Sequence, residues 1–210
     1  MHPVEQKSVL DSMVILVDTR EQDTPRLRLR LKKMECPYER QKLDFGDYSA
    51  KFRLPTGDWW SLAGRVAVER KMSLDELCQC YTRSRDRFTR EFERAAGMGA
   101  KIYLLVENGS WEQAWDGEFR TRMTPQALIA SMTAWLARYN CQLLFCEPKL
   151  SGPLIREVLY REAKELLESG QFNVSEVSAR TGYKSSQYFS ITFRRYMGYS
   201  PSEAEAHKGE

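Results

Sequence analysis

The chain alternates short apolar runs with stretches whose apolar residues follow a helical spacing. Nearly continuous apolar runs cover 13–17, 101–107 and 142–146, a pattern typical of strands buried on both faces of a sheet. A further run, 66–69, leads directly into charged residues. Strand and helix patterns alternate from 101 to 146, which predicts an α/β layer structure with some parallel pairing.

Helices are predicted between these strands. Within the segment 26–34, residues 26–31 alternate Arg and Leu, which is the period of a strand. The segment follows Thr24-Pro25, however, and Pro is favoured in the first turn of a helix. Ser73 is a good N-cap, with Glu76 three residues later as its capping-box partner. Helices are also predicted over 73–97 with a break near 82–86, over 124–139 and over 154–168.

The segments before residue 66 are shorter and more mixed. Residues 1–12 form a polar lead, and 38–54 look like a hairpin or strand pair around a Gly-Asp dipeptide. Residues 55–58 are a predicted turn, and 59–62 a short strand that returns toward the apolar run after it.

The composition predicts a globular protein with one main domain and an appendage. The chain has 210 residues, 42% of them hydrophobic and 29% charged, so it can bury a core and lacks a disordered composition. A net charge of +3 is too small to indicate a nucleic-acid partner. Basic residues are nevertheless concentrated in the stretch 83–101, where Arg83, Arg85, Arg87, Arg90, Arg94 and Lys101 outnumber Asp86, Glu91 and Glu93.

Cysteine usage and hydropathy bear on localisation. The five cysteines form no Cys-x-x-Cys pair and the chain has only two histidines, which argues against a structural zinc site and favours reduced thiols. No apolar run reaches the length of a membrane span, and the N-terminus lacks the layout of a secretory signal. We therefore expect a cytoplasmic protein with no membrane partner.

The charged end of the run at 66–69 is the strongest chemical signal in the chain. Because strand side chains alternate between faces, Glu69 and Lys71 point to one side and Arg70 to the other. If Asp47 lies on a neighbouring strand, Asp47 and Glu69 can hold a hard divalent cation, and Lys71 can orient or deprotonate a water. Such a site hydrolyses phosphodiesters, although a lone Gly-Asp is more often a turn and a lone Glu-Arg-Lys a solvated strand end.

Three short motifs occur in order along the chain, and they are Val17-Asp18-x-Arg20-Glu21, Gly46-Asp47-Tyr48, and Glu69-Arg70-Lys71 followed by Asp75. Taken together they resemble the nuclease domain of the XPF family, which includes the archaeal Hef nuclease. The resemblance covers roughly residues 13–150. It implies a metal-dependent, structure-selective DNA endonuclease with a restriction-endonuclease-like α/β core, in which helices flank a central mixed sheet. It also favours a helix over 26–34.

The resemblance and the strand geometry together give these residues expected roles. Asp47 and Glu69 bind Mg²⁺ or Mn²⁺, Asp18 supports the ion directly or through water, and Arg70 contributes at most its backbone carbonyl. Lys71 positions the attacking water and completes the catalytic set. Arg20, Glu21 and Asp75 are expected to support these groups, and Arg83 and Arg87 to contact DNA.

DNA is the expected partner, and a homodimer through the nuclease domain is an arrangement to test. The rival interpretation of the whole chain is a DNA-binding regulator that uses a nuclease fold as a scaffold, but a non-cleaving relative has no reason to keep Asp47, Glu69 and Lys71 together.

The pattern changes after Gly152-Pro153, which predicts a division into domains 1–152 and 153–210. Two short helical patterns joined across a glycine are typical of a helix-turn-helix. The segment 193–201 resembles the end of the second helix-turn-helix of AraC-type regulators. The resemblance to this helix-turn-helix covers roughly residues 170–203.

That resemblance implies a small all-α unit that binds DNA. The start of its recognition helix would reach base edges or phosphates in a major groove. The alternative is that Phe189, Phe193 and Tyr196 cap the α/β core and the unit binds nothing. The residues expected to contact DNA are Lys184, Ser185, Ser186, Gln187, Tyr188, Arg194 and Arg195.

Overall fold

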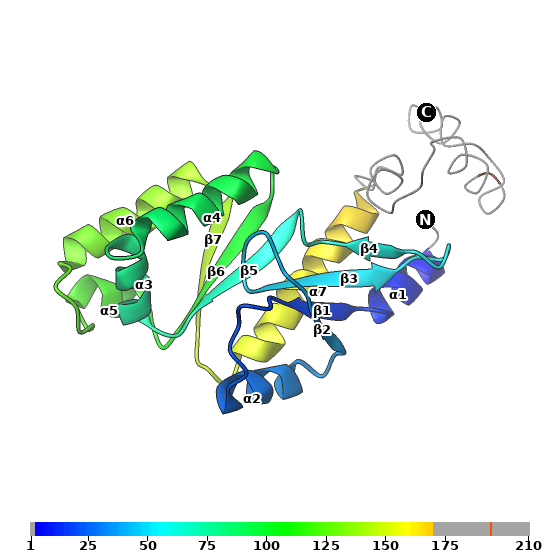
Figure 1. The fold of residues 1–210 in the computed structure, drawn as a ribbon, viewed down its shortest axis with the longest axis horizontal. Helices are drawn as coiled ribbons and strands as arrows, with labels where there is room; N and C mark the ends of the chain where they lie inside the picture. The colour runs from blue at the N-terminus through cyan, green and yellow to red at the C-terminus, as the bar shows by residue number, and fades with distance from the viewer. Residues whose placement is uncertain (1–2, 170–193, 195–210) are drawn as a thin grey trace. The chain divides into compact units, whose positions relative to one another are not determined.

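A mixed sheet forms the centre of the computed structural model, which describes residues 3–169 and Arg194 (Figure 1). The order across the sheet is β2-β1-β3-β5-β6-β7, with β4 paired to β3 outside this path. The strands are β1 Val14–Val17, β2 Tyr38–Arg40, β3 Tyr48–Arg53, β4 Trp59–Ser61, β5 Val66–Lys71, β6 Lys101–Glu107 and β7 Cys141–Cys146.

The strand directions bring several strand ends to one edge of the sheet. β3 runs antiparallel to β1 and β5, β2 is parallel to β1, and β5, β6 and β7 are parallel to one another. The register places Tyr48 between Val17 and Val68. The C-terminal ends of β1 and β5 therefore meet the N-terminal end of β3, at the kind of edge where α/β sheets bind ligands.

Helices connect the strands, and side-chain caps start several of them. Thr24 accepts a hydrogen bond from the Leu27 amide, and Ser73 accepts one from the Glu76 amide. The Glu76 carboxylate reaches back to the Met72 amide. The helices are α1 Pro3–Asp11, α2 Pro25–Met34, α3 Leu74–Tyr81, α4 Arg85–Gly97, α5 Trp111–Asp116, α6 Pro125–Arg138 and α7 Ser151–Glu168.

One face of the sheet carries the main apolar core. Ile102 and Leu104 of β6 face a cluster completed by residues of α3, α4 and α6. Phe88 and Phe92 of α4 pack against Trp135 of α6, with ring centroids 5.7 and 6.2 Å away. Figure 1 shows α4 and α6 side by side over this part of the sheet.

The opposite face of β6 meets α7. Lys101 and Tyr103, which alternate with the core residues of the strand, both contact the Glu162 carboxylate of that helix. Along β6, therefore, Ile102 and Leu104 face the apolar cluster, and Lys101 and Tyr103 face a carboxylate of α7.

The chain divides into two compact units. Met13–Lys51 and Ser61–Glu162 form the larger, which contains the strand ends described above. Met1–Ser12, Phe52–Trp60 and Ala163–Glu210 form the smaller, of which part is described.

The α/β structure with parallel pairing is confirmed, and so are the strands at the four apolar runs and the helix from Pro25. Other expectations were wrong. The polar lead contains helix α1, whose Val9 and Leu10 are buried. Residues 38–54 form no hairpin, because β2 and β3 lie on opposite sides of β1. Helix α5 was not predicted, and α7 begins at Ser151. The predicted helix-turn-helix lies outside the described residues, apart from Arg194.

Candidate active site

The candidate site is built around Asp47, at the point where β1 and β5 end and β3 begins. The Asp47 amide donates to the Val68 carbonyl at 2.9 Å, and the Asp47 carbonyl accepts from the Asp18 amide at 2.9 Å. The backbone of Asp47 is thus hydrogen-bonded to both neighbouring strands. Two of the predicted motifs meet at this residue, and the third continues from Val68.

The Asp47 side chain occupies a position that a strand would otherwise fill. β3 pairs with β5 at Tyr48 and Val68, so the Arg70 amide lies beyond the end of β3. Asp47 Oδ2 accepts from that amide at 2.8 Å. Burial and the nearby Glu69 carboxylate together raise the pKa of Asp47 well above its ordinary value. The site therefore holds this carboxylate where a positive charge would stabilise it.

Glu69 and Lys71 lie on the same face of β5, as strand alternation predicts. Both are buried, and the Lys71 ammonium donates to Glu69 Oε1. Burial alone would lower the pKa of Lys71, but the Glu69 and Asp47 carboxylates outweigh it and raise that pKa. Lys71 Nζ also lies 5.3 Å from the centroid of the Phe88 ring. In this arrangement Lys71 is a charged hydrogen-bond donor rather than a base.

The second carboxylate oxygen of Glu69 is the feature that indicates a possible cation ligand. Glu69 Oε2 is buried and has no hydrogen-bond partner, which is costly unless a ligand satisfies it. Burial raises the pKa of Glu69, in partial opposition to the Lys71 charge. Among residues 3–169, no cluster of three or more His, Cys, Asp or Glu side chains forms a complete protein-built metal site. Two carboxylates fit Mg²⁺, which commonly binds one or two and completes its shell with water and substrate phosphates.

Asp18 has a different environment from the one expected of a direct metal ligand. Its Oδ1 accepts from Arg20 Nε at 2.7 Å, and its Oδ2 accepts from the Leu43 amide at 2.7 Å. Burial would raise the pKa of Asp18, but these hydrogen bonds lower it overall. Both oxygens are therefore engaged, and the geometry favours a role for Asp18 in holding Arg20, whose side chain is 45% exposed.

Glu91 of α4 is a member of the site that the sequence analysis missed. It is buried, and its Oε1 accepts from the Gly46 amide at 2.9 Å, next to Asp47. Arg20 Nη2 lies 4.0 Å from the same oxygen. The signal was available in the sequence, because Glu91 shares the helical face of Phe88 and Phe92, but it was counted as a surface charge.

Gly46 allows this close approach. It has a φ of +72°, and a Cβ atom at this position would lie 2.6 Å from the Cβ of Ala67 and 3.3 Å from the Val68 carbonyl oxygen. The Gly-Asp pair therefore leads the chain into β3 close to Ala67 and Val68 of β5, and it is not the turn of a hairpin.

Glu21 and the Arg70 side chain lie on the opposite face of the sheet. Glu21 Oε2 accepts from the Tyr48 hydroxyl at 3.1 Å and lies 4.0 Å from Arg30 Nη1. Arg70 Nη1 donates to Glu107 Oε2 at 3.2 Å. The predicted direction of the Arg70 side chain agrees with this structure. The structure does not bring Glu21 to the Glu69 and Lys71 face.

Asp75 follows β5 but is engaged elsewhere. Its Oδ1 accepts from the Arg120 amide, so it ties the start of α3 to the loop after α5. Within residues 3–169, Asp75 makes no hydrogen bond or ion pair with Asp47, Glu69 or Lys71.

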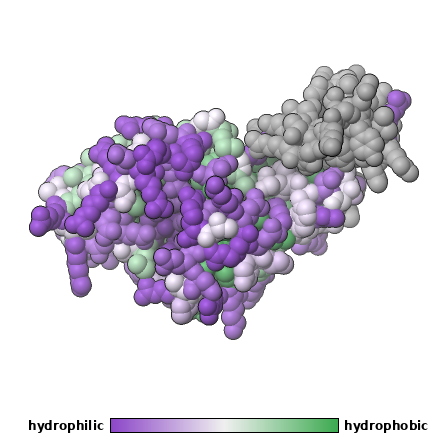
Figure 2. All heavy atoms as spheres, in the orientation of Figure 1, coloured by the Kyte–Doolittle hydropathy of each residue, from purple (hydrophilic) through white to green (hydrophobic). Residues whose placement is uncertain are grey.

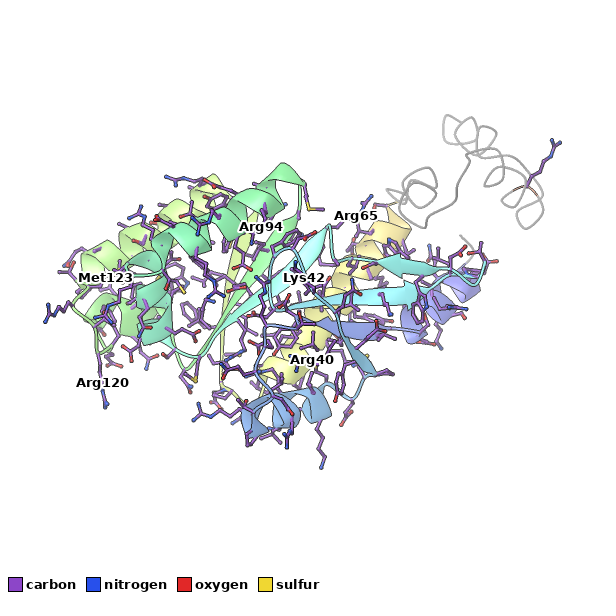
Figure 3. The ribbon with its side chains drawn as sticks, viewed as in Figure 1. Arg40, Lys42, Arg65, Arg94, Arg120 and Met123 are labelled. Atoms are coloured by element: carbon purple, nitrogen blue, oxygen red, sulfur yellow. The ribbon has the colours of Figure 1, made fainter. Side chains whose placement is uncertain are left out.

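Basic side chains lie around the loop that carries Asp47. Arg94 of α4 donates to the Asp44 carbonyl at 2.9 Å, and Lys42 is exposed in the same loop. Figure 3 labels both, and Figure 2 shows that the face seen in this orientation is mainly hydrophilic. Arg83 and Arg87 are also exposed, in the turn before α4 and in its first turn.

The predicted recognition helix is not among the described residues. Arg194 is helical and exposed. The other predicted contacts lie outside the described part of the chain, and they are Lys184, Ser185, Ser186, Gln187, Tyr188 and Arg195.

Comparisons with known proteins agree with both resemblances. Residues 17–151 match the ERCC4 domain family, and residues 152–207 match a helix-turn-helix domain family. XPF from Aeropyrum pernix has a similar structure, with a TM-score of 0.51 and 20% identity, over 89% of this chain and 82% of that chain. At this identity the likeness shows the fold alone, which is an XPF-like nuclease fold with a mixed sheet flanked by helices.

One curated protein also matches a short stretch. Histidine kinase P4 of Formosa agariphila is 37% identical over 49 residues, or 23% of this chain. The chain spans only 4% of that protein's length.

None of the helices among the described residues is long and apolar enough to cross a membrane.

The geometry at Gly46 gives a first prediction. We expect Gly46→Ala to destabilise the protein by at least about 1–3 kcal/mol, because left-handed backbone strain adds to the overlap with Ala67. Gly97→Ala is the matched control, since position 97 has an ordinary φ and open space around it. It should stay within about 1 kcal/mol of wild type. Urea unfolding followed by circular dichroism measures both, and equal stabilities would contradict the close approach.

Proposed function

The chain belongs to the ERCC4 domain family, and on that premise we propose that it is a metal-dependent endonuclease that hydrolyses phosphodiester bonds in DNA. We further propose that its substrates are branched or otherwise structured DNA in repair, recombination or replication. The observation that carries the proposal is the buried, unpartnered Glu69 Oε2 beside Asp47 and the Lys71 ammonium.

In this proposal Asp47 and Glu69 hold Mg²⁺ or Mn²⁺, with Arg70 contributing at most its backbone carbonyl. The bound ion supplies Lewis acidity toward the phosphate and lowers the pKa of a coordinated water. Asp18 acts through Arg20, because both of its oxygens already accept hydrogen bonds. Glu21 holds the Tyr48 hydroxyl and Asp75 holds the Arg120 amide, so in this proposal neither acts on the reacting atoms.

Lys71 acts on the reacting groups as a fixed cation. Its contact with the Phe88 ring holds the ammonium near β5 when Glu69 turns toward a ligand. From there it donates a hydrogen bond to the attacking water or a phosphate oxygen and stabilises the charge that develops there. The exposed guanidinium of Arg20 is placed to bind a neighbouring phosphate.

DNA binding is divided between two parts of the chain in this proposal, with domains 1–152 and 153–210. Near the site, Lys42, Arg83, Arg87 and Arg94 bind phosphates, as their exposure and charge allow. In the second part, the predicted recognition helix adds base or phosphate contacts, consistent with the matched helix-turn-helix family.

A homodimer through the nuclease domain is a further part of the proposal. β7 is the last strand of the sheet order, and Leu143, Leu144 and Phe145 on it are only partly buried. Trp115 of α5 is 69% exposed. An apolar edge of this kind is suited to pairing with a second copy.

Metal dependence is the first test of the proposed function. Mg²⁺ and Mn²⁺ should support cleavage of DNA, whereas Ca²⁺ should support binding with little cleavage, because it accepts the same oxygen ligands but is larger and activates water poorly. A nicking assay on flap, fork, junction and linear duplex DNA measures this for the full chain. Cleavage that persists in excess EDTA would rule out the proposed chemistry.

A second test separates metal binding from catalysis. Asp47→Asn should weaken Mn²⁺ binding and abolish cutting, because it removes a ligand charge. Lys71→Ala should lower the cleavage rate by about 100-fold or more without weakening Mn²⁺ or DNA binding, because the ammonium acts mainly in the transition state. Mn²⁺ titration followed by electron paramagnetic resonance reports affinity. Lys149→Ala, which removes an exposed lysine paired with Glu147, is the control. Equal loss of Mn²⁺ affinity in the Asp47 and Lys71 variants would assign Lys71 a structural role.

The DNA contacts can be tested by the salt dependence of binding. Lys42→Ala and Arg194→Ala, each in the full chain, should each reduce the slope of log affinity against log salt by about one unit, because one phosphate contact is lost. Arg28→Ala is the control, since Arg28 is already paired with Asp23 on the exposed side of α2. Binding measured with Ca²⁺ avoids cleavage. If Arg194→Ala leaves the slope unchanged, Arg194 makes no phosphate contact.

A further inference from the structure

A chain of buried charges lies on the face of the sheet opposite Lys71. Glu107 at the end of β6 bridges two guanidinium groups. Its Oε1 accepts from Arg30 Nη2 at 3.1 Å and its Oε2 from Arg70 Nη1 at 3.2 Å. Arg30 and Glu107 are 6% and 3% exposed. We call Arg30, Glu107 and Arg70 the buried charge chain.

Further hydrogen bonds fix the Arg30 end of the buried charge chain. Arg30 Nε donates to the Ser151 hydroxyl at 3.1 Å, and Arg30 Nη1 donates to the Tyr48 hydroxyl at 3.0 Å. Ser151 is the first residue of α7. A Cβ atom on the next residue, Gly152, would lie 2.5 Å from the Arg30 carbonyl oxygen, so α2 and α7 approach closely here. Arg30 is therefore held by three elements of the fold.

The free energy of folding does not explain why these charges are buried. Removing each charge from water costs several kcal/mol, and apolar side chains of similar volume are often as stabilising as a buried ion network. Arg70 Nε, moreover, is buried without a hydrogen-bond partner. What the charge chain does achieve is a fixed position for the Arg70 side chain at the end of β5.

The position of Arg70 matters because its amide holds Asp47. Arg70 is the last residue but one of β5, and beyond Tyr48 there is no β3 backbone to pair with it. Asp47 Oδ2 accepts from the Arg70 amide at 2.8 Å in place of that backbone. Arg70 therefore makes both contacts. Its side chain is held by Glu107 on one face of β5, and its amide holds the Asp47 carboxylate at the edge of that strand.

We propose that Arg30 and Glu107 are positioning residues of the site, which set the place of the Asp47 carboxylate through Arg70. The proposal rests on the proposed function for its catalytic consequence, but the effect on metal affinity stands without it. Partners that orient metal-binding groups in this way are commonly worth about 10- to 100-fold in metal affinity or activity.

The central experiment compares Glu107→Gln with Glu162→Gln. The first keeps the size of the side chain but leaves one carbonyl oxygen to face two guanidinium groups. The second breaks the Lys101 and Glu162 ion pair, which lies on the same face of β6 but has no connection to Asp47. Three quantities are measured for the full chain: the unfolding midpoint, the Mn²⁺ dissociation constant, and the single-turnover cleavage rate.

We expect Glu107→Gln to weaken Mn²⁺ binding and slow cleavage by about tenfold or more. Glu162→Gln should change neither, even where it lowers the unfolding midpoint by as much. If Glu107→Gln lowers only the unfolding midpoint, the charge chain is structural and the proposal is wrong. If the wild-type protein binds Mn²⁺ but cleaves no DNA, the proposed function fails while the Mn²⁺ comparison still decides this inference.

Two milder variants cover the case in which Glu107→Gln does not fold. Arg30→Lys keeps the charge but cannot reach Ser151, Tyr48 and Glu107 together, because an ammonium lacks the planar fork of a guanidinium. Ser151→Ala removes one acceptor from Arg30. Both should weaken Mn²⁺ binding, with the larger effect for Arg30→Lys. Wild-type Mn²⁺ affinity in a folded Arg30→Lys variant would overturn the proposal.

Discussion

The arrangement of the site depends on the hydrogen bond between the Arg70 amide and the Asp47 carboxylate. β3 begins at Tyr48, opposite Val68, whereas β5 continues to Lys71, so the backbone donor of Arg70 has no β3 backbone to pair with. An acidic side chain satisfies that donor and is thereby fixed beside Glu69. The same arrangement explains Gly46, because the chain passes Ala67 and Val68 of β5 so closely that no side chain fits there. The position of the Asp47 carboxylate is in this way set by the point at which β3 begins.

The alternation of side chains along β5 separates two kinds of polar chemistry. Glu69 and Lys71 face α4, which contributes the Phe88 ring beside the Lys71 ammonium and the buried Glu91. Arg70 faces the other way and pairs with Glu107. One strand of the sheet therefore supplies both the buried Glu69 and Lys71 pair and the amide that holds Asp47. A one-residue shift in the register of β5 would exchange these faces, so the pairing of β5 with β6 keeps Glu69 and Lys71 on the face of α4.

The sequence predicted the elements whose signals are local. Continuous apolar runs identified the buried strands, and Thr24-Pro25 and Ser73 identified helix starts because caps act within one turn. The direction of Arg70 followed from strand alternation. Long-range features were missed. The crossing of the chain from β2 to β3 depends on pairing with β1, and no local pattern distinguishes it from a hairpin. The contact of Glu91 with Gly46 joins residues 45 positions apart in sequence, and the contact between Arg30 and Glu107 joins residues 77 positions apart. Asp18 lies at the predicted strand end, but its engagement with Arg20 and Leu43 could be seen only in three dimensions.

The balance of charge distinguishes the two faces at this edge of the sheet. On the face away from Lys71, the carboxylates of Glu21 and Glu107 are matched by the guanidinium groups of Arg30 and Arg70. On the other face, the four carboxylates of Asp18, Asp47, Glu69 and Glu91 gather around the two cations Arg20 and Lys71. When all these groups are ionised, the first set is neutral and the second carries an excess of two negative charges. The raised pKa values of Asp47 and Glu69 express the cost of that excess in a buried setting. A divalent cation is the simplest ligand that removes it, and the buried oxygen of Glu69 that lacks a partner lies on this face.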